Sequence, residues 1–463
     1  MILLVGFAVV FLSVFPPSLL VNDSFLTLVA GREVAEHGLP HHDALTVIGA
    51  GQTWTDQQWA AQLVAYGAYK LGGHAVLALL AAVLVVSAFV IAAVAARSLG
   101  AGPRGIVLVF FPVILAAPWA WTIRAQVFCL PLFTGLVWLL ASEARRPSRK
   151  AYLAIPLLVV WANLHGSVAL GALLTMLLAV IELVRSRGRT ALRSALLLVL
   201  APLAALVTPY DPLDTARYYR LMLLDPPFAD HVSEWQRSNP DWNTLVFYVL
   251  AAAALGLAVW GRKRLTAFDL ATLALTFVGA VLAIRGIPWF ALSCMVLLPV
   301  AIGRALEGGA APVRSGVNRS LAAGALVVLG AVIAVTLLRE PSWFERKWPN
   351  DALPAVRSAA SDPRSLVFAT DRHADWLLWK IPDLRGRIAY DVRFELYEPS
   401  FFDRLVDYHG EEGADWKSLA DGYDVVVVDE LGTSHTADFL KEPRARALYR
   451  DDKVTVVLRP NQR

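Results

Sequence analysis

Apolar stretches long enough to cross a bilayer recur along the first 338 residues. A helix needs about 17–25 mostly apolar residues to cross roughly 30 Å of hydrocarbon. Stretches that meet or approach this length lie at residues 2–21, 75–96, 105–122, 126–142, 151–165, 167–184, 191–208, 244–260, 267–284, 287–303 and 320–338. The pattern therefore predicts a membrane bundle of about eleven transmembrane helices.

The stretch 151–184 is interrupted only by the sequence NLHGS, so its division into two helices needs a second argument. Lys and Arg collect in short cytoplasmic loops. With the division, the basic segments all fall on one side: Arg97 and Arg104, EARRPSRK, RSRGRTALR, GRKR, and Arg304, Arg314 and Arg319. A single long helix would move every later basic loop to the opposite side. We therefore predict two helices, a cytoplasmic N-terminus, and two long outer loops at residues 22–73 and 209–243.

The pattern changes after residue 338, where charged residues become frequent. Short β-rich runs (SLVFAT, RIAYD, DVVVVDE and KVTVVL) alternate with helix-like stretches (FFDRLVDYHG and ADWKSLADG). A nearly continuous Val run is typical of a strand buried on both faces. The sequence predicts a transmembrane domain over residues 1–338 and an extracytoplasmic α/β domain over residues 339–463.

Composition supports a membrane protein, because 57% of the 463 residues are hydrophobic and only 17% are charged. The net charge of +4 reflects basic loops and contact with anionic lipids, and does not indicate nucleic-acid binding. The two cysteines, Cys129 and Cys294, lie in predicted spans, so no disulfide framework is expected outside. The first stretch lacks a basic leader and a small-residue cleavage site, so we expect an uncleaved span.

Asp23 lies immediately outside the first predicted span, and two interpretations of it stay open. Asn22, Asp23 and Ser24 are favoured N-cap residues for a helix over residues 25–38. Alternatively, a carboxylate at this depth suits a general base for a lipid-borne substrate. The helix over 25–38 and a second one over 56–73 carry apolar and aromatic residues at helical spacing, which predicts two helices lying in the membrane interface.

This layout resembles the GT-C superfamily of polytopic glycosyltransferases, and within it a bacterial branch with HG after a Trp-Ala-Asn segment. The segments WANLHGSVALG and YDVRFELY carry that likeness. Such enzymes transfer a sugar from a polyprenyl-phosphate or polyprenyl-diphosphate carrier to an acceptor outside the bacterial cytoplasmic membrane. The acidic residue of their first outer loop maps onto Asp23, with Asp43 as the next candidate. Protein mannosyltransferases and aminoarabinose transferases tend to have Asp-Glu there, whereas Ser24 follows Asp23 here.

The resemblance implies a division of roles. Asp23 would accept the proton of the acceptor hydroxyl, and cations would stabilise the departing lipid phosphate. Arg124 and Arg285 sit among aromatics at the outer ends of spans, where an arginine either binds phosphate or simply extends to the interface. The other candidate substrate-binding residues are Arg217, Arg220, Glu234 and Trp235 in the second outer loop, Trp59 and His165. The alternative for them is an ordinary interfacial or packing role.

A metal site is not favoured, although HGLPHHD gathers His37, His41, His42 and Asp43, because a proline-containing turn gives no regular ligand face. Two other classes of protein compete with the transferase. A lipid or polysaccharide transporter or flippase would need ionisable residues near the bilayer midplane, and the only acids in the spans, Glu182 and Asp269, lie near cytoplasmic ends. A non-catalytic scaffold would not need acids and aromatics at the outer face. The sequence leaves the sugar, the carrier lipid and the glycan, lipid or protein acceptor open.

Overall fold

A computed structural model of the chain describes residues 20–185, 188–224, 226–306, 315–413, 415–431 and 435–459. The chain forms two compact units. The helical unit contains Leu71–Ala216 and Ser233–Arg339, and the mixed unit contains Leu20–Lys70, Arg217–Val232 and Glu340–Arg463. The mixed unit therefore combines residues of both predicted outer loops with the predicted C-terminal domain. The first predicted span lies outside the described residues except for Leu20 and Val21.

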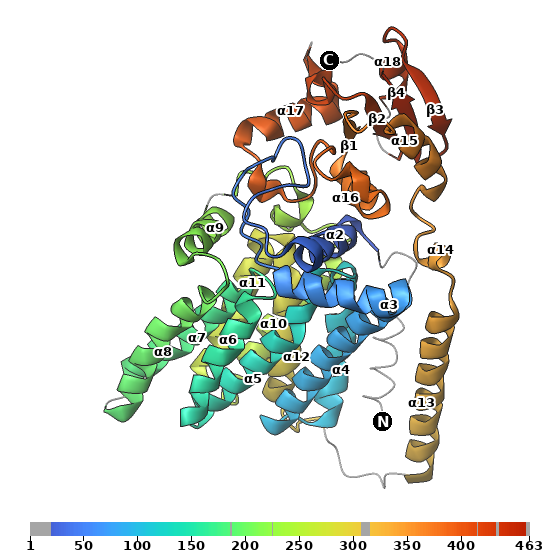
Figure 1. Ribbon diagram of the computed structural model, residues 1–463. Coiled ribbons are helices and arrows are strands. Elements are labelled where there is room, and N and C mark those ends of the chain that lie inside the picture. The colour runs from blue at the N-terminus through green and yellow to red at the C-terminus, as the bar shows by residue number, and fades with distance from the viewer. Residues whose placement is uncertain are drawn as a thin grey trace. The chain divides into compact units, whose positions relative to one another are not determined.

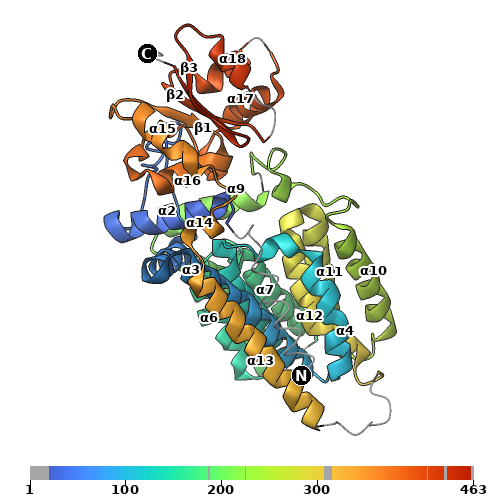
Figure 2. The same cartoon turned by 90° about the vertical axis from the view of Figure 1, so that its right-hand side faces the viewer.

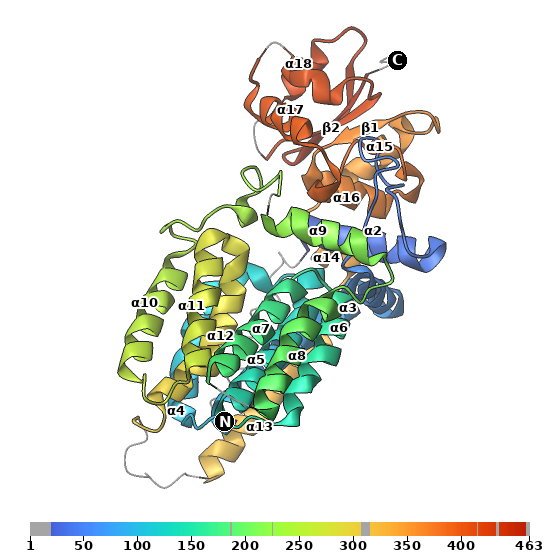
Figure 3. The ribbon, with the colours of Figure 1, turned by 90° about the vertical axis from the view of Figure 1, so that its left-hand side faces the viewer.

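In the helical unit, a helix lies in each of the ten predicted stretches that fall within the described residues (Figure 1 and Figure 3). These helices are α3 (Trp59–Ser98), α4 (Pro103–Ala116), α5 (Leu130–Arg145), α6 (Ala154–Ala162), α7 (Val168–Arg185), α8 (Arg189–Ala205), α10 (Leu245–Trp260), α11 (Ala267–Leu282), α12 (Ile287–Ile302) and α13 (Ser315–Leu338). Among the described residues, the helices long and apolar enough to cross a membrane are Trp59–Ser98, Ala125–Arg145, Val168–Arg185, Ile284–Ile302 and Arg319–Leu338. The total of eleven spans stays a prediction.

The predicted division of residues 151–184 is confirmed, because α6 and α7 are separate helices joined by the NLHGS turn. The predicted break between residues 56–73 and the next span is also confirmed. There α3 is interrupted at Gly72 and Gly73, and Gly73 has a φ of +63°, which glycine adopts without strain. Short 3₁₀ helices occupy several connections: η1 (Pro118–Trp121), η2 (Ala125–Cys129), η3 (Arg149–Leu153), η4 (Ser233–Trp235) and η5 (Ile284–Gly286).

Ion pairs join the ends of helices where the basic loops lie. Arg145, the last residue of α5, donates two hydrogen bonds to Asp269 of α11, at 3.1 and 2.7 Å. Arg193 of α8 binds Glu143 at 3.0 Å and also binds Glu182. The few acids of these helices are thus neutralised by arginine, as buried charges require.

The mixed unit contains a four-stranded sheet in the order β1-β2-β4-β3 (Figure 2). Its strands are β1 (Val367–Ala369), β2 (Val425–Asp429), β3 (Arg446–Arg450) and β4 (Val454–Leu458). β1 pairs with β2 in parallel, and the other pairs are antiparallel. The Val run of β2 is buried, as predicted. The prediction of a strand at RIAYD is wrong, because Ile388 forms only isolated bridges, to Thr46 and Val367. Strand β3 was not predicted from the sequence.

Helices that lie wholly or partly in the mixed unit accompany this sheet. They are α2 (Asn22–His37), α9 (Pro212–Leu224), α14 (Pro341–Phe344), α15 (Leu353–Ala359), α16 (Asp371–Lys380), α17 (Pro399–Gly410) and α18 (Thr436–Leu440), with 3₁₀ turns η6 (Asn350–Ala352), η7 (Pro382–Leu384), η8 (Phe394–Leu396) and η9 (Trp416–Ala420). α15 packs against β2, β3 and β4. Tyr408 of α17 packs on Phe368 of β1, with ring centroids 5.0 Å apart. ADWKSLADG forms the short η9 instead of a full helix.

Helix α2 is part of the protein core. Phe25, Leu28 and Val29 are fully buried, and Phe25 packs edge-on against Trp348 with ring centroids 4.6 Å apart. α2 also packs against α16. The apolar stripe that predicted an interfacial helix is thus covered by the C-terminal segment of the same unit.

Several contacts tie the first outer loop to the C-terminal segment. Arg385 donates to both oxygens of Glu33 at 2.9 and 3.0 Å. The backbone N–H of Val47 donates to the carbonyl of Ile388 at 2.7 Å. These contacts explain why residues distant in sequence form one compact unit.

Gly31 of α2 gives a first prediction about this packing. A Cβ atom at Gly31 would lie 2.2 Å from the backbone oxygen of Gln62 in α3, which cannot move like the end of a flexible side chain. We expect Gly31→Ala to lower stability by about 1–3 kcal/mol, measured as thermal unfolding of the full chain in detergent. Gly67→Ala on α3 is the matched control, because no atom lies within 4 Å of its Cβ position. Equal melting of Gly31→Ala and wild type would contradict this packing.

Candidate functional site

Asp23 lies in the first turn of α2, and the helix has its N-cap at Val21. The capping interpretation of Asp23 is therefore wrong. Ser24 completes the start of the helix, because its side chain accepts the N–H of Val21 at 3.0 Å. A carboxylate in the first turn is favoured by the partial positive charge of a helix N-terminus. The side chain of Asp23 is half-buried.

Two carboxyl groups of α16 lie in the electrostatic environment of Asp23. Burial, followed by the charges of Asp23 and Asp429, raises the pKa of Asp371 to about 6. Burial, Asp391 and Asp23 raise the pKa of Asp375 well above its usual range, against the charge of Arg393. We call Asp23, Asp371 and Asp375 the carboxylate group. Asp371 is the first residue of α16 and follows β1 after a single residue, so the end of the strand positions it.

Asp43 belongs to a different network, centred on the buried Arg393. Arg393 Nη2 lies 2.6 Å from Asp43 Oδ1 and 2.6 Å from Asp391 Oδ2, and Arg393 Nε lies 2.9 Å from the latter oxygen. Its guanidinium stacks on Trp54, 4.2 Å from the ring centroid. Asp43 also accepts the backbone N–H of Leu45 at 2.9 Å. These contacts describe an anchor of the loop, and a catalytic role of Asp43 stays a prediction.

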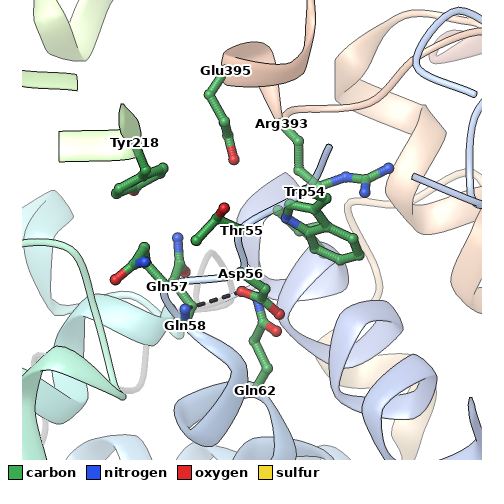
Figure 4. A pocket seen from close by; sticks show the side chains of 10 residues that line it. Trp54, Thr55, Asp56, Gln57, Gln58, Gln62, Tyr218, Arg393 and Glu395 are labelled. Carbon is green, nitrogen blue, oxygen red and sulfur yellow. Dashed lines mark hydrogen bonds between the residues drawn. The ribbon is translucent and has the colours of Figure 1, made fainter. Parts of the chain in front are cut away.

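A pocket of about 260 Å³, including its open mouth, lies beside this network (Figure 4). Its polar and aromatic lining includes Trp54, Asp56, Gln57, Gln62, Tyr218 and Glu395. Burial raises the pKa of Asp56 to about 7, against the N–H of Gln58 and the charge of Arg393. Burial likewise raises the pKa of Glu395 to about 7. The sequence reasoning missed this pocket. Its only local signal is the polar run DQQ between Trp54 and Trp59.

In the helical unit, the structure brings together four candidate residues from three segments. Arg124 Nη1 lies 2.5 Å from Glu234 Oε1. The guanidinium of Arg285 lies over the ring of Trp235, 4.1 Å from its centroid. The backbone holds these segments in place, because the N–H of Ile284 donates to the carbonyl of Gln236 at 3.0 Å. This cationic and aromatic group lies at the helix ends opposite to the basic loops.

His165 completes this group from the NLHGS turn. Its Nδ1 accepts the backbone N–H of Ser167 at 3.0 Å, so the remaining ring nitrogen carries the proton in the neutral form. The side chain of His165 is buried, so the ring is enclosed by protein at the end of its predicted span.

The remaining candidates lie elsewhere in the mixed unit. Arg217 and Arg220 are exposed on α9, and Trp59 begins α3 with a half-buried side chain. His231, a further residue of the second outer loop, stacks on Phe402, with ring centroids 5.6 Å apart. Within the described part of the chain, no group of three or more His, Cys, Asp or Glu residues could hold a metal ion.

Comparison with known proteins gives fold relatives only. No protein-family model matches the sequence, and no curated protein matches it. Solved structures with a similar fold include ArnT from Cupriavidus metallidurans bound to undecaprenyl phosphate, with a TM-score of 0.52 and 14% identity over 98% of this chain and 96% of that one. They also include the oligosaccharyltransferase AglB from Archaeoglobus fulgidus with an inhibitory peptide and a dolichol-phosphate, with a TM-score of 0.56 and 13% identity over 92% of this chain and 69% of that one. Arabinofuranosyltransferase AftD from Mycobacteria has a TM-score of 0.56 and 17% identity over 98% of this chain and 41% of that one.

These relatives are transferases of the GT-C class, and this chain has their fold over nearly its whole length. Together with the apolar helices, the likeness identifies a multi-pass membrane protein. The resemblance expected from the sequence is confirmed at the level of the fold.

The raised pKa of Asp371 predicts how stability depends on pH. Folded Asp371 has a pKa of about 6 against the usual 3.8 of an aspartate, so the folded state binds more protons between about pH 4 and pH 6. Its contribution to stability therefore falls as pH rises through that interval. We expect Asp371→Asn to melt at a higher temperature than wild type at pH 7.5, with the difference shrinking towards pH 4.5.

Asp452→Asn is the control, because Asp452 is an exposed carboxylate in the turn between β3 and β4. The melting temperatures of this variant serve as the baseline against which the pH dependence of Asp371→Asn is compared. A difference for Asp371→Asn that stays constant would show that burial and the charge of Asp23 do not act on this carboxyl.

Proposed function

We propose that this protein is a membrane glycosyltransferase that moves a sugar from a polyprenyl-phosphate-type donor to an extracytoplasmic acceptor, with Asp23 as the general base. The observation that carries the proposal is the position of Asp23. It lies in the first turn of a helix, beside two further carboxyl groups, in a chain with the GT-C fold. The solved relatives with bound undecaprenyl phosphate or dolichol-phosphate support a donor of this type.

The proposed reaction needs few residue types. The acceptor hydroxyl oxygen forms a bond to the anomeric carbon of the sugar, and its proton passes to the Asp23 carboxylate. The bond between the anomeric carbon and the phosphate oxygen breaks, and the lipid phosphate leaves with the electron pair. Asp375, whose pKa is raised, suits the neutral form, so the carboxylate group need not hold three negative charges at once.

The group around Arg124 and Arg285 is our candidate for binding the lipid phosphate. A guanidinium binds phosphate oxygens in a bidentate manner. Arg124 is paired with Glu234, and Arg285 is held by Trp235, so both side chains are already oriented. His165 adds a ring N–H donor, because its other ring nitrogen accepts the backbone N–H of Ser167.

The acids of the helical unit do not favour a transporter. Ion-coupled carriers need ionisable groups that exchange partners during transport. Asp269 is fixed by Arg145 and by the N–H and side chain of Thr266, and Glu182 by Arg193 and Ser194. These are pairs that join helix ends.

Asp23→Asn tests the proposed base. We expect transfer to fall about 10²–10⁴-fold, because asparagine cannot accept the proton, while the melting temperature stays near that of wild type. Transfer is measured in reconstituted membranes supplied with polyprenyl-phosphate-linked sugars. Glu36→Gln is the matched control, since Glu36 is an exposed carboxylate at the other end of α2, and it should keep wild-type transfer.

Asp43→Asn is measured in the same transfer assay and in thermal unfolding, for comparison with Asp23→Asn. Its carboxylate is paired with Arg393, so this variant should lose stability as well as activity. Wild-type transfer by Asp23→Asn would remove Asp23 from the mechanism and direct attention to Asp43 or Glu234.

The basic loops also support a proposed orientation, with the N-terminus in the cytoplasm and residues 339–463 outside. Reporter fusions at Arg146 and Arg264 should report the cytoplasm, and a fusion after Arg339 should report the opposite side. A cytoplasmic signal from the last fusion would reverse the layout and exclude an extracytoplasmic reaction at Asp23.

A further inference from the structure

We propose that Trp242 anchors the second outer loop in the lipid headgroup layer of the membrane, on the side of the helical unit opposite to the basic loops. Trp260, the last residue of α10, marks the other boundary of the membrane. The helix α10 therefore crosses the membrane between the two tryptophans, and the partner of the exposed Trp242 side chain is lipid.

The side chain of Trp242 is exposed, although the backbone that carries it is held in place. Its side chain is 91% exposed. It lies in a turn in which Asp241 Oδ1 accepts the N–H groups of Asn243 and Thr244 at 2.8 and 2.9 Å. The large apolar ring is thus presented outward by an ordered turn.

Two contacts fix this loop to the outer ends of α10 and α11. The N–H of Ser238 donates to the carbonyl of Val281, near the end of α11, at 3.0 Å. The hydroxyl of Tyr248, in the first turn of α10, donates to the carbonyl of Ser238 at 2.8 Å. The turn that carries Trp242 therefore keeps a constant height along these two helices.

An exposed apolar face of α10 continues from Trp242. Its members recur at helical spacing, and they include Leu245, Val249, Leu255 and Val259. The opposite side of α10 packs on α4 and α12 at the edge of the helical unit (Figure 3). A helix that is apolar on its exposed side as well as on its packed side is typical of a membrane span. Continuity with this face indicates that lipid surrounds Trp242.

The spacing of the two tryptophans fits the thickness of a membrane. With 16 residues, α10 is about 24 Å long, and the turn of Trp242 extends it outward. The hydrocarbon core is roughly 30 Å thick. Tryptophan is enriched at both membrane interfaces, where its ring lies at the headgroup level. Trp242 and Trp260 thus lie where hydrocarbon gives way to headgroups.

The inner end of α10 supports this assignment. Trp260 is exposed, and the guanidinium of Arg264 lies over its ring, 5.6 Å from the centroid. Arg262 and Lys263 follow Trp260 and are also exposed. Cations beside the end of a span are typical of its cytoplasmic side, where they contact anionic headgroups.

The depth of Trp242 has a consequence for the candidate phosphate-binding group. Glu234 and Trp235 belong to the same loop, and the carbonyl of Gln236 accepts the N–H of Ile284 at 3.0 Å. A loop anchored by Trp242 holds these residues at the level of lipid phosphates. This consequence rests on the proposed function, whereas the contact of Trp242 with lipid does not.

A spin label at Asn243→Cys tests the anchor, because Asn243 is exposed and its replacement leaves Trp242 intact. The full chain is placed in nanodiscs of phosphatidylcholine and phosphatidylglycerol. The ratio of the label's accessibility to oxygen and to a water-soluble nickel chelate measures depth. We expect a ratio between that of Val249→Cys, on the lipid face of α10, and that of Asp452→Cys, in the exposed turn between β3 and β4.

Trp242→Ser should shift the ratio at Asn243→Cys towards the value in water, because serine has no preference for the interface. Asn239→Ser is the matched control, since Asn239 is an exposed polar residue of the same loop, and it should leave the ratio unchanged. Labelled wild type gives the background, because Cys129 and Cys294 are fully buried.

The anchor is excluded if the ratio at Asn243→Cys equals that of Asp452→Cys or of Val249→Cys, or if Trp242→Ser leaves it unchanged. Equal loss of both accessibilities would show that a second copy of the chain covers Trp242, and would exclude the contact with lipid. The measurement needs neither donor nor transfer, so it can fail while Asp23→Asn still loses activity.

The consequence for the donor has its own measurement. In the transfer assay, Trp242→Ser should raise the KM for a polyprenyl-phosphate-linked sugar several-fold and leave kcat near that of wild type. An unchanged KM would show that the depth of the loop does not affect donor binding.

Discussion

The buried guanidinium of Arg393 determines how the mixed unit is arranged. It binds carboxylates from two distant parts of the chain, Asp43 and Asp391, and stacks on Trp54. Removal of one partner from such a buried pair typically costs about 3–5 kcal/mol, because the other charge is left uncompensated. The loop between α2 and α3 is therefore held by electrostatic contacts as well as by packing. The pocket beside it, with Asp56, Gln57 and Glu395, depends on the same anchor.

The membrane part of the fold was largely predictable, because lipid imposes a length and an apolar composition on each helix. The turn NLHGS illustrates this point: hydropathy alone left residues 151–184 ambiguous, and the alternation of basic loops resolved the ambiguity correctly. The Val run of β2 was recognisable for a similar reason, since burial on both faces leaves a continuous pattern. RIAYD has strand-like composition but obtains only isolated bridges, because its neighbours in space are set by tertiary packing.

The candidate sites were predictable only where chemistry coincides with a local pattern. Asp23 was found because it follows a span, and Arg124 and Arg285 because they lie at helix ends among aromatics. Asp371 and Arg393 were not found, because Asp23, which acts on Asp371, and Asp43, which binds Arg393, lie hundreds of residues away in the sequence. The burial of Gln57 and Gln62 could not be predicted either, since polar residues before a helix or in its first turns usually remain in solvent.

The separation of Asp43 and Arg393 by 350 residues has a consequence for the time course of synthesis. At about 5–20 residues per second, roughly 20–70 s pass between the emergence of the two partners. During that time Phe25, Leu28 and Val29 of α2 lack the C-terminal residues that later cover them. An amphipathic helix in this state is stabilised at a membrane surface, which shields its apolar side from water and from other chains. The apolar pattern of α2 is thus suited to contact with the membrane surface during synthesis. The helix becomes buried once the C-terminal residues have folded over it.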